Sequence, residues 1–171
     1  MTRSSAREIA IHCSYSLGFS HESADEFLAE RLNKENFQRW SQESALYKEY
    51  PNEKQLQYIE ELVRGVANHG PELDQYIAQY AKDWSFARIP LPAAAIMRVA
   101  MYEILYMPDI PAAAAINDAV EIAKKYEDGK VVSFINGILG AFVRAEFPEQ
   151  FQDKKTASAE AEPPAEHKEE A

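Results

Sequence analysis

Residue types that commonly act in catalysis are scattered along this chain of 171 residues. Its four histidines are far apart in the sequence, at His12, His21, His69 and His167. The chain has no glycine-rich phosphate loop, and it has neither HExxH nor GxSxG, the motifs of zinc proteases and serine hydrolases. Its many carboxylates lie mostly on amphipathic segments, where such side chains usually form a solvated face. We therefore predict a protein that is not an enzyme, with no catalytic residues, no metal site and no cofactor.

The single cysteine, Cys13, limits the redox chemistry of the chain. A lone cysteine excludes an internal disulfide and a cysteine-cluster zinc site, and it fits a reducing compartment. The sequence has no run of about 18 apolar residues, and its N-terminus, MTRSSAREIA, lacks the apolar stretch of a signal peptide. These features predict a cytoplasmic protein without membrane contact, in which Cys13 is a small core residue.

The net charge of −10 is unusual for a protein that binds nucleic acid, because phosphate contacts normally require a basic surface. Residues 148–171 are rich in Glu, Ala, Pro and Lys, and their seven acidic and three basic side chains carry −4 of this charge. We predict a folded domain over 1–147 and a disordered acidic tail over 148–171. Since the domain is acidic as well, any nucleic-acid site on it has to be a local patch.

The remaining composition and its periodicity are typical of an all-α protein. Only six glycines occur, and long segments are rich in good helix formers. Two Ser-x-x-Glu capping boxes, at Ser5 and Ser23, and a capping residue at Asn52 mark helix starts. The aromatic-rich segment around Phe37 and Tyr47 is predicted to be irregular. We predict about seven helices and no sheet, with helices that begin at or near Ser5, Ser23, Asn52, Pro71, Pro92, Pro111 and Val131.

The helix that begins near Pro92 is apolar over most of its surface, which predicts a central position in the fold. Its polar residues Arg98, Tyr102 and Glu103 are expected to form internal links between helices. Asn136, an amide between apolar neighbours on the last helix, is expected to be buried and hydrogen-bonded.

A specific pattern of five segments runs from Trp84 to Val143. The segments are Trp84, the helix AAIMRVAMYEIL, the break Asp109-Ile110-Pro111, AINDAVEIAKKY from Ala115 to Tyr126, and SFINGIL from Ser133 to Leu139. None is diagnostic alone, but their order and spacing over about 60 residues resemble the NusB family of transcription antitermination factors. The segment AREIAIHCSYS, from Ala6 to Ser16, also resembles the first helix of that family.

This resemblance implies a fold of two small, packed helical bundles and a function in transcription. Members of the family recognise the boxA RNA element as a complex with NusE, a small-subunit ribosomal protein. The complex helps RNA polymerase read through terminators in ribosomal RNA operons, and contact with the polymerase elongation complex is indirect. The mechanism is assembly without a catalytic step, because neither protein alone provides the whole RNA surface.

The resemblance also implies which residues contact RNA. The arginine-rich N-terminus of the family corresponds to Arg3 and Arg7, and its later contacts correspond to Lys124, Lys125, Tyr126, Lys130 and Phe134. Single-stranded RNA is commonly held by cations on phosphates and by aromatic rings under bases, which these residue types supply. Each has a structural alternative, since the aromatic residues can be core and the lysines at the end of a helix can interact with its dipole.

Departures from the family pattern leave two alternatives open. The N-terminus has two arginines where many members have three or more, and Ala93 and Ala94 stand where charged residues are common near the surface expected to meet NusE. Asp118 replaces the more usual Glu. A NusB-like domain also occurs in front of a cytosine RNA methyltransferase, but the length of this chain argues against that activity. The other alternative is a non-catalytic helical protein-interaction module, or a homodimer, without RNA binding.

Overall fold

The computed structural model describes residues 1–150 except residue 83, and this part of the chain folds into helices connected by short loops, without a strand. The predicted all-α class is confirmed. Eight α-helices and two single-turn 3-10 helices cover the described residues: α1 (Arg3–Leu17), α2 (Ala24–Arg31), α3 (Lys34–Trp40), η1 (Ala45–Tyr47), α4 (Glu53–Asn68), α5 (Gly70–Tyr80), η2 (Phe86–Arg88), α6 (Leu91–Tyr106), α7 (Ala112–Tyr126) and α8 (Gly129–Glu146).

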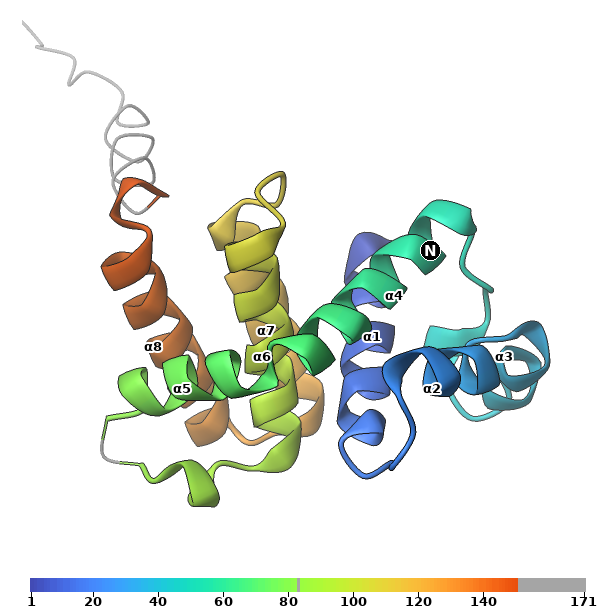
Figure 1. The fold of residues 1–171 in the computed structure, drawn as a ribbon, viewed down its shortest axis with the longest axis horizontal. Coiled ribbons are helices and arrows are strands. Elements are labelled where there is room, and N and C mark those ends of the chain that lie inside the picture. The colour runs from blue at the N-terminus through green and yellow to red at the C-terminus, as the bar shows by residue number, and fades with distance from the viewer. Residues whose placement is uncertain (83, 151–171) are drawn as a thin grey trace, which may run out of the picture.

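Two helical bundles share α6 as their central element (Figure 1). Helix α6 packs against α1 and α4 of the N-terminal bundle and against α5, α7 and α8 of the C-terminal bundle. Its side chains Ile96, Met97 and Met101 are enclosed on all sides, as expected for a helix that is apolar around its circumference. One continuous apolar core therefore joins the two bundles.

Helix α1 starts earlier than its sequence predicts. The Thr2 hydroxyl accepts a hydrogen bond from the Ser5 backbone N–H at 3.0 Å, so Thr2 is the capping residue and Ser5 lies inside the helix. The capping box predicted for Ser5 and Glu8 is wrong, because the Glu8 carboxylate points to α7 instead. The capping box at Ser23 and the cap at Asn52 are confirmed.

The aromatic segment that follows α2 is more regular than predicted. It forms the short helix α3 and the turn η1, which are held together by ring contacts. The buried Phe37 ring lies 5.2 Å from the Tyr47 ring and 5.1 Å from the Tyr50 ring, both nearly edge-to-face. Edge-to-face pairs of this kind stabilise each other beyond the area that they bury.

One further expectation, on Asn136, is wrong. Asn136 is exposed, because the inward face of α8 is formed by Ile135, Ile138 and Leu139 and the next residue after Ile135 turns away from it. Ala93 and Ala94 are buried in the first turn of α6 and form no surface. Their small side chains allow the start of α6 to pack closely against its neighbours.

The predicted boundary at residues 147 and 148 falls just after the end of α8 at Glu146. Most of the predicted disordered tail, residues 151–171, lies outside the described residues, so the tail stays a prediction. Across 1–150 without residue 83, no helix is long and apolar enough to span a membrane. The same residues contain no cluster of three or more side chains suited to hold a metal ion.

Candidate nucleic-acid interface

Helices α1 and α7 run in the same direction, and long polar side chains connect them. The Ser4 hydroxyl donates to the Asp118 carboxylate at 2.9 Å near the start of α1. Further along α1, Glu8 contacts Lys125 and Tyr126 at the end of α7. We call this series of contacts along the two helices the α1–α7 ladder. It brings the part of α1 around Glu8 next to the end of α7, where the sequence predicts RNA contacts.

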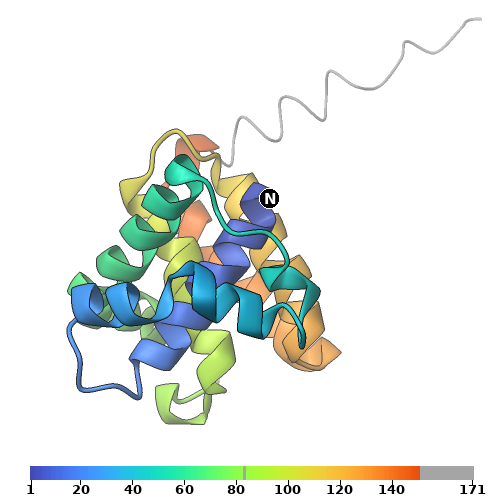
Figure 2. The ribbon, with the colours of Figure 1, turned by 90° about the vertical axis from the view of Figure 1, so that its right-hand side faces the viewer.

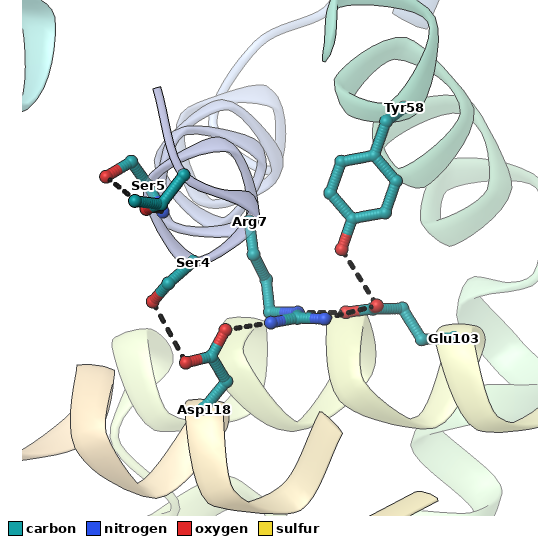
Figure 3. Close-up of polar contacts among 7 residues, drawn as sticks. Ser4, Ser5, Arg7, Tyr58, Glu103 and Asp118 are labelled. Carbon is teal, nitrogen blue, oxygen red and sulfur yellow. Dashed lines mark hydrogen bonds and ion pairs between the residues drawn. The ribbon is translucent and has the colours of Figure 1, made fainter. Parts of the chain in front are cut away.

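Arg7 lies in the interior of this ladder (Figure 3). Its side chain forms a two-pronged contact with Glu103 of α6, at 2.5 Å from Nε to Oε1 and 2.8 Å from Nη2 to Oε2, and a third ion pair with Asp118. The Tyr58 hydroxyl of α4 donates to the same Glu103 carboxylate at 2.8 Å. Arg7 is 3% exposed and Glu103 is 0% exposed. Four helices, α1, α4, α6 and α7, thus meet at one buried charge cluster.

The surroundings of Arg7 fix its charge and remove it from the surface. Burial alone would lower the pKa of Arg7, but the hydrogen bond and the negative charge of Glu103 outweigh burial and raise it. A guanidinium that already donates to Glu103 and Asp118 has no accessible face for an RNA phosphate. The predicted links of Glu103 to other helices are confirmed, and so is that of Arg98, whose Nε donates to Asp74 at 2.6 Å.

Arg3, in contrast, is exposed at the first turn of α1. Its guanidinium carbon lies 5.1 Å from the centre of the Tyr58 ring, which leaves the charge accessible to solvent. The structure therefore separates the two arginines that the sequence pairs: Arg3 can reach a phosphate, and Arg7 supports the helices beneath it.

Tyr126 is the last residue of α7; its hydroxyl is held by hydrogen bonds, and its ring is exposed to solvent. The hydroxyl donates to Glu8 at 2.5 Å and contacts His12 at 2.6 Å, while 45% of the residue is exposed. Lys125 binds the other Glu8 oxygen at 2.8 Å. Glu8 itself is buried; Lys125 balances its negative charge, and the Tyr126 phenol donates a hydrogen bond to it. An exposed ring held by its own hydroxyl is well suited to stack on a base, because little side-chain entropy remains to be lost.

The hydrogen bonds of His12 define its tautomer. Tyr126 has one hydroxyl proton, which goes to Glu8, so the Tyr126 oxygen accepts from His12 Nε2. Nδ1 of His12 then accepts from the Tyr47 hydroxyl at 2.7 Å. Burial lowers the pKa of His12, and the positive charge of Lys125 acts in the same direction, whereas Glu8 opposes them. His12 is consequently neutral at pH 7 and connects α1, η1 and α7.

This arrangement predicts a pH dependence of stability. Because the pKa of His12 is lower in the folded protein than its ordinary value near 6.5, the unfolded chain binds this proton first as the pH falls. The contribution is complete above about pH 6.5 and is lost below it, at up to about 1.4 kcal/mol per pH unit. We expect His12→Gln, whose amide can keep one donor and one acceptor, to reduce the loss of unfolding free energy between pH 7.5 and 5.5 by about 1 kcal/mol, measured by urea denaturation.

The matched control for this prediction is His21→Gln, the same substitution at a histidine whose side chain is exposed to solvent. A smaller pH dependence of stability in the His12 variant than in the His21 variant would assign the effect to His12. Identical profiles for the His12 variant and the parent would show that His12 takes up its proton equally well in both states.

A second aromatic pair lies at the start of α8. The Trp84 and Phe134 rings are 4.7 Å apart, and the Lys130 ammonium lies 5.8 Å from the centre of the Trp84 ring. Phe134 is half-buried against the core, and Lys130 is exposed. Only two residues separate the end of α7 from the start of α8, so Tyr126 and Lys130 belong to the same end of the bundle.

The structure thus places Lys124, Lys125 and Tyr126 at the end of α7 and Lys130 at the start of α8, where the partly buried Phe134 packs against the Trp84 ring. Lys124 completes the group on α7, where its ammonium binds Glu121 at 2.7 Å on the exposed face. The sequence missed three residues that shape this site: Glu8, His12 and Trp84. Glu8 and His12 are paired with residues more than 100 positions away, and no local pattern reveals such partners.

Comparison with known proteins agrees with this architecture. The NusB family model matches residues 4–144. The transcription antitermination protein NusB of Symbiobacterium thermophilum is 33% identical over 144 residues, which cover 84% of this chain and 90% of that protein. The protein of the same name from Thermoanaerobacter sp. (strain X514) is 39% identical over 146 residues, covering 85% of this chain and 93% of that protein.

Two solved structures share the fold. NusB of T. maritima is 24% identical, with a TM-score of 0.63, and the similarity covers 88% of this chain and 98% of that chain. A chain in the crystal structure of the antitermination factors NusB and NusE in complex with double-stranded RNA is 24% identical, with a TM-score of 0.66, and the similarity covers 84% and 96%. The family match over almost the whole described chain, together with relatives of more than 30% identity along most of their length, shows that this chain belongs to the NusB family.

Proposed function

We propose that this NusB-family chain is a transcription antitermination factor that binds boxA-type RNA jointly with the ribosomal protein NusE and promotes read-through by RNA polymerase in ribosomal RNA operons. Relatives named transcription antitermination proteins support this proposal, as does the solved complex of NusB and NusE with RNA. The chain acts by assembly in the cytoplasm and is not an enzyme, and its contact with RNA polymerase is indirect.

The observation that carries the proposal is the end of α7. The Tyr126 ring is exposed while its hydroxyl is fixed by Glu8 and His12, and Lys125, the residue before it, binds the same Glu8. Lys130 over the Trp84 ring adds a cation next to a second ring system. Stacking platforms flanked by cations are the usual way in which proteins hold single-stranded RNA.

Within the proposed site the residues have different roles. Tyr126 stacks on a base, and Phe134 supports the Trp84 ring beside it. Phosphate contacts are assigned to the accessible cations, Arg3, Lys124, Lys125 and Lys130. Arg7 is left out of this set and acts as a positioning residue, because its buried guanidinium holds α1 against α6 and α7.

The charges around the site favour joint binding. Lys124 is paired with Glu121, and Lys125 is paired with Glu8, so part of each positive charge is already balanced. RNA affinity that depends on so few free cations is weak, and a basic partner that adds cations along the same RNA strengthens it.

A place for that partner is available beside the site. A largely apolar pocket of about 480 Å³ lies between α1, η1 and the start of α6, and both Tyr15 and Tyr126 line it. The nearby exposed side chains Phe19 and Leu91 are large and apolar. A protein docked on this surface would extend the RNA site directly from Tyr126, and we assign it to NusE.

We expect loss of two accessible cations to weaken RNA binding. Lys124→Gln combined with Lys130→Gln removes two phosphate contacts and leaves the Lys125–Glu8 pair intact. The affinity for labelled boxA RNA at about 50 mM salt should fall by about tenfold or more, and the slope of log affinity against log salt should decrease by about 1.4. Fluorescence anisotropy titration measures both quantities.

The control for this experiment is Lys34→Gln combined with Lys48→Gln, two exposed lysines on the α3 and η1 side of the molecule. This variant has the same net charge as the test variant and should bind RNA as the parent does. Equal losses in both variants would mean that RNA responds only to overall charge, and no loss in either would move the RNA site away from α7 and α8.

A further inference from the structure

The side chain of Tyr102 on α6 crosses the backbone of α4 at Gly65. A Cβ atom at Gly65 would lie 2.1 Å from Cζ and 2.5 Å from the hydroxyl of Tyr102, so only glycine lets the phenol pass there. Tyr102 is 8% exposed, yet its hydroxyl has no hydrogen-bond partner among the described residues. Because no fully enclosed side-chain polar atom in the described part of the chain lacks a partner, the small exposed area of this hydroxyl opens to the outside.

The opening is a polar pocket of about 310 Å³ on the outer face of α4. Glu61, Gly65 and His69 follow each other at intervals of one helical turn along its floor, and Tyr102 reaches it from below. Tyr102 as a whole is nine-tenths buried, and its hydroxyl, the part that opens into the pocket, has no hydrogen-bond partner among the described residues. The Tyr102 hydroxyl can therefore accept a hydrogen bond from, or donate one to, a polar group that enters the pocket from outside the chain.

Stacked rings extend this pocket toward α5. The Tyr106 ring lies 5.1 Å from the Tyr102 ring and 4.3 Å from the His69 ring, with interplanar angles of 34° and 32°. The Tyr106 hydroxyl donates to Glu72 at 2.7 Å, which fixes the outermost ring while leaving it exposed. An exposed, fixed aromatic face beside carboxylates attracts a cation.

The charges of the pocket are negative. Glu61 is exposed and forms no ion pair with a described residue; burial, and after it the negative charge of Glu61, raises the pKa of Tyr102. The basic side chains that line the pocket are already paired: Arg64 binds Asp25 at 2.5 Å and Glu60 at 3.4 Å, and His69 contacts Glu72 at 3.0 Å. Phosphate groups are repelled by such a surface, whereas a guanidinium is attracted by it.

The pocket lies on α4, on the opposite side of the molecule from α7, which carries Tyr126 and its neighbouring lysines. Helix α4 forms the front of the molecule in Figure 1 and its left side in Figure 2, while α7 lies at the back in Figure 1 and on the right in Figure 2. Both surfaces can therefore be occupied at the same time.

We propose that this pocket binds an arginine side chain presented by a basic segment of a partner protein. The guanidinium donates to the free Tyr102 hydroxyl oxygen and to the Glu61 carboxylate, and its planar face lies along the ring stack of His69 and Tyr106. The planar fork of arginine suits two acceptors in one plane and also stacks on aromatic faces. This inference is independent of the RNA-binding function.

The test uses an acetylated and amidated peptide of four arginines and two glycines, titrated into the full chain and followed by the NMR signals of the Gly65 and His69 amides. We expect both signals to shift and the affinity to fall by about tenfold in Tyr102→Phe and in Glu61→Gln, since each removes one bond to a charged donor. Tyr102→Phe removes a hydroxyl without a partner, so its melting temperature should equal that of the parent.

Two controls make the result specific. Glu53→Gln removes a carboxylate from the first turn of the same helix, outside the pocket, and should bind the peptide as the parent does. The same peptide with glutamines in place of arginines should not shift the signals. Absence of shifts with the arginine peptide, or equal affinity losses in the Glu53 and Glu61 variants, would overturn the proposal, and so would unchanged affinity in Tyr102→Phe.

Discussion

Replacement of Arg7 by alanine is expected to lower the free energy of unfolding by about 3–5 kcal/mol, because it leaves a buried charge without its partner. Glu103 is completely buried and would keep only the Tyr58 hydroxyl, while Asp118 would lose its ion pair to α1. Desolvating a carboxylate is expensive unless an opposite charge compensates for it. Urea denaturation at pH 7 measures the change directly.

Arg3→Ala is the matched control, since Arg3 is the same residue type one turn earlier on the same helix. Arg3 is exposed, so its loss should change the unfolding free energy by no more than about 0.5 kcal/mol. In RNA titrations at a temperature where both variants are folded, we expect Arg3→Ala to reduce the salt dependence. A stable Arg7→Ala protein that binds RNA poorly would contradict our assignment and place Arg7 on the RNA.

Substitution of Gly65 by alanine is expected to destabilise the protein by about 2 kcal/mol, although alanine is the better helix former. The helix propensity of alanine favours the change by about 1 kcal/mol, but the added methyl group would lie 2.1 Å from the Tyr102 ring. Overpacking of this kind typically costs about 1–3 kcal/mol or more, because the ring and the α4 backbone have to move apart. Thermal and urea unfolding of the variant measure the net effect.

Gly137→Ala on α8 is the control that separates the effect of the contact between position 65 and Tyr102 from the effect of helix propensity. Gly137 is also helical, but a Cβ there meets no atom within 4 Å, so alanine should stabilise the protein by up to about 1 kcal/mol. The two alanine variants should therefore differ by about 3 kcal/mol in unfolding free energy. Equal stability of the two would show that Tyr102 does not rest on α4 as described.

The helical fold could be predicted where the information is local. The side-chain caps at Ser23 and Asn52 depend only on residues within one helical turn, and both predictions are confirmed. The apolar surface of α6 can be recognised from its own sequence, and its predicted central position is confirmed as well. The predictions for Ser5 and Asn136 are wrong. In both, a local rule gives way to tertiary structure: Glu8 bonds to α7 instead of its own helix end, and the core-facing side of α8 excludes Asn136.

The candidate site could be predicted only in part. Its cations and Tyr126 come from a family resemblance in the sequence; the structure places the lysines and Tyr126 at the junction of α7 and α8, but Arg3 and Arg7 lie on α1. The role of Arg7 could not be read from the sequence, because two arginines at a helix start oppose the helix dipole and suggest an external ligand. The buried carboxylate of Glu103 on α6 and the partly buried one of Asp118 on α7 provide the compensation instead, and only the three-dimensional fold brings them to Arg7.

The buried and exposed halves of the α1–α7 ladder have separate tasks in this account. Arg7, Glu103 and Asp118 hold three helices in a fixed relation, and Glu8 and His12 fix Tyr126 at the far end. In the proposed function the exposed residues would meet RNA on this rigid base. Because few of these cations are free, the proposal predicts low RNA affinity for the chain alone and a strict need for the partner protein.

The most direct test of that claim is a titration of labelled boxA RNA with the full chain, with and without NusE, at several salt concentrations. We expect weak binding by the chain alone, binding at least tenfold tighter with NusE present, and a steep decrease of affinity with salt in both cases. An RNA affinity that is unchanged by NusE would contradict the joint-surface account, and this chain would then be a helical interaction module that does not act in antitermination.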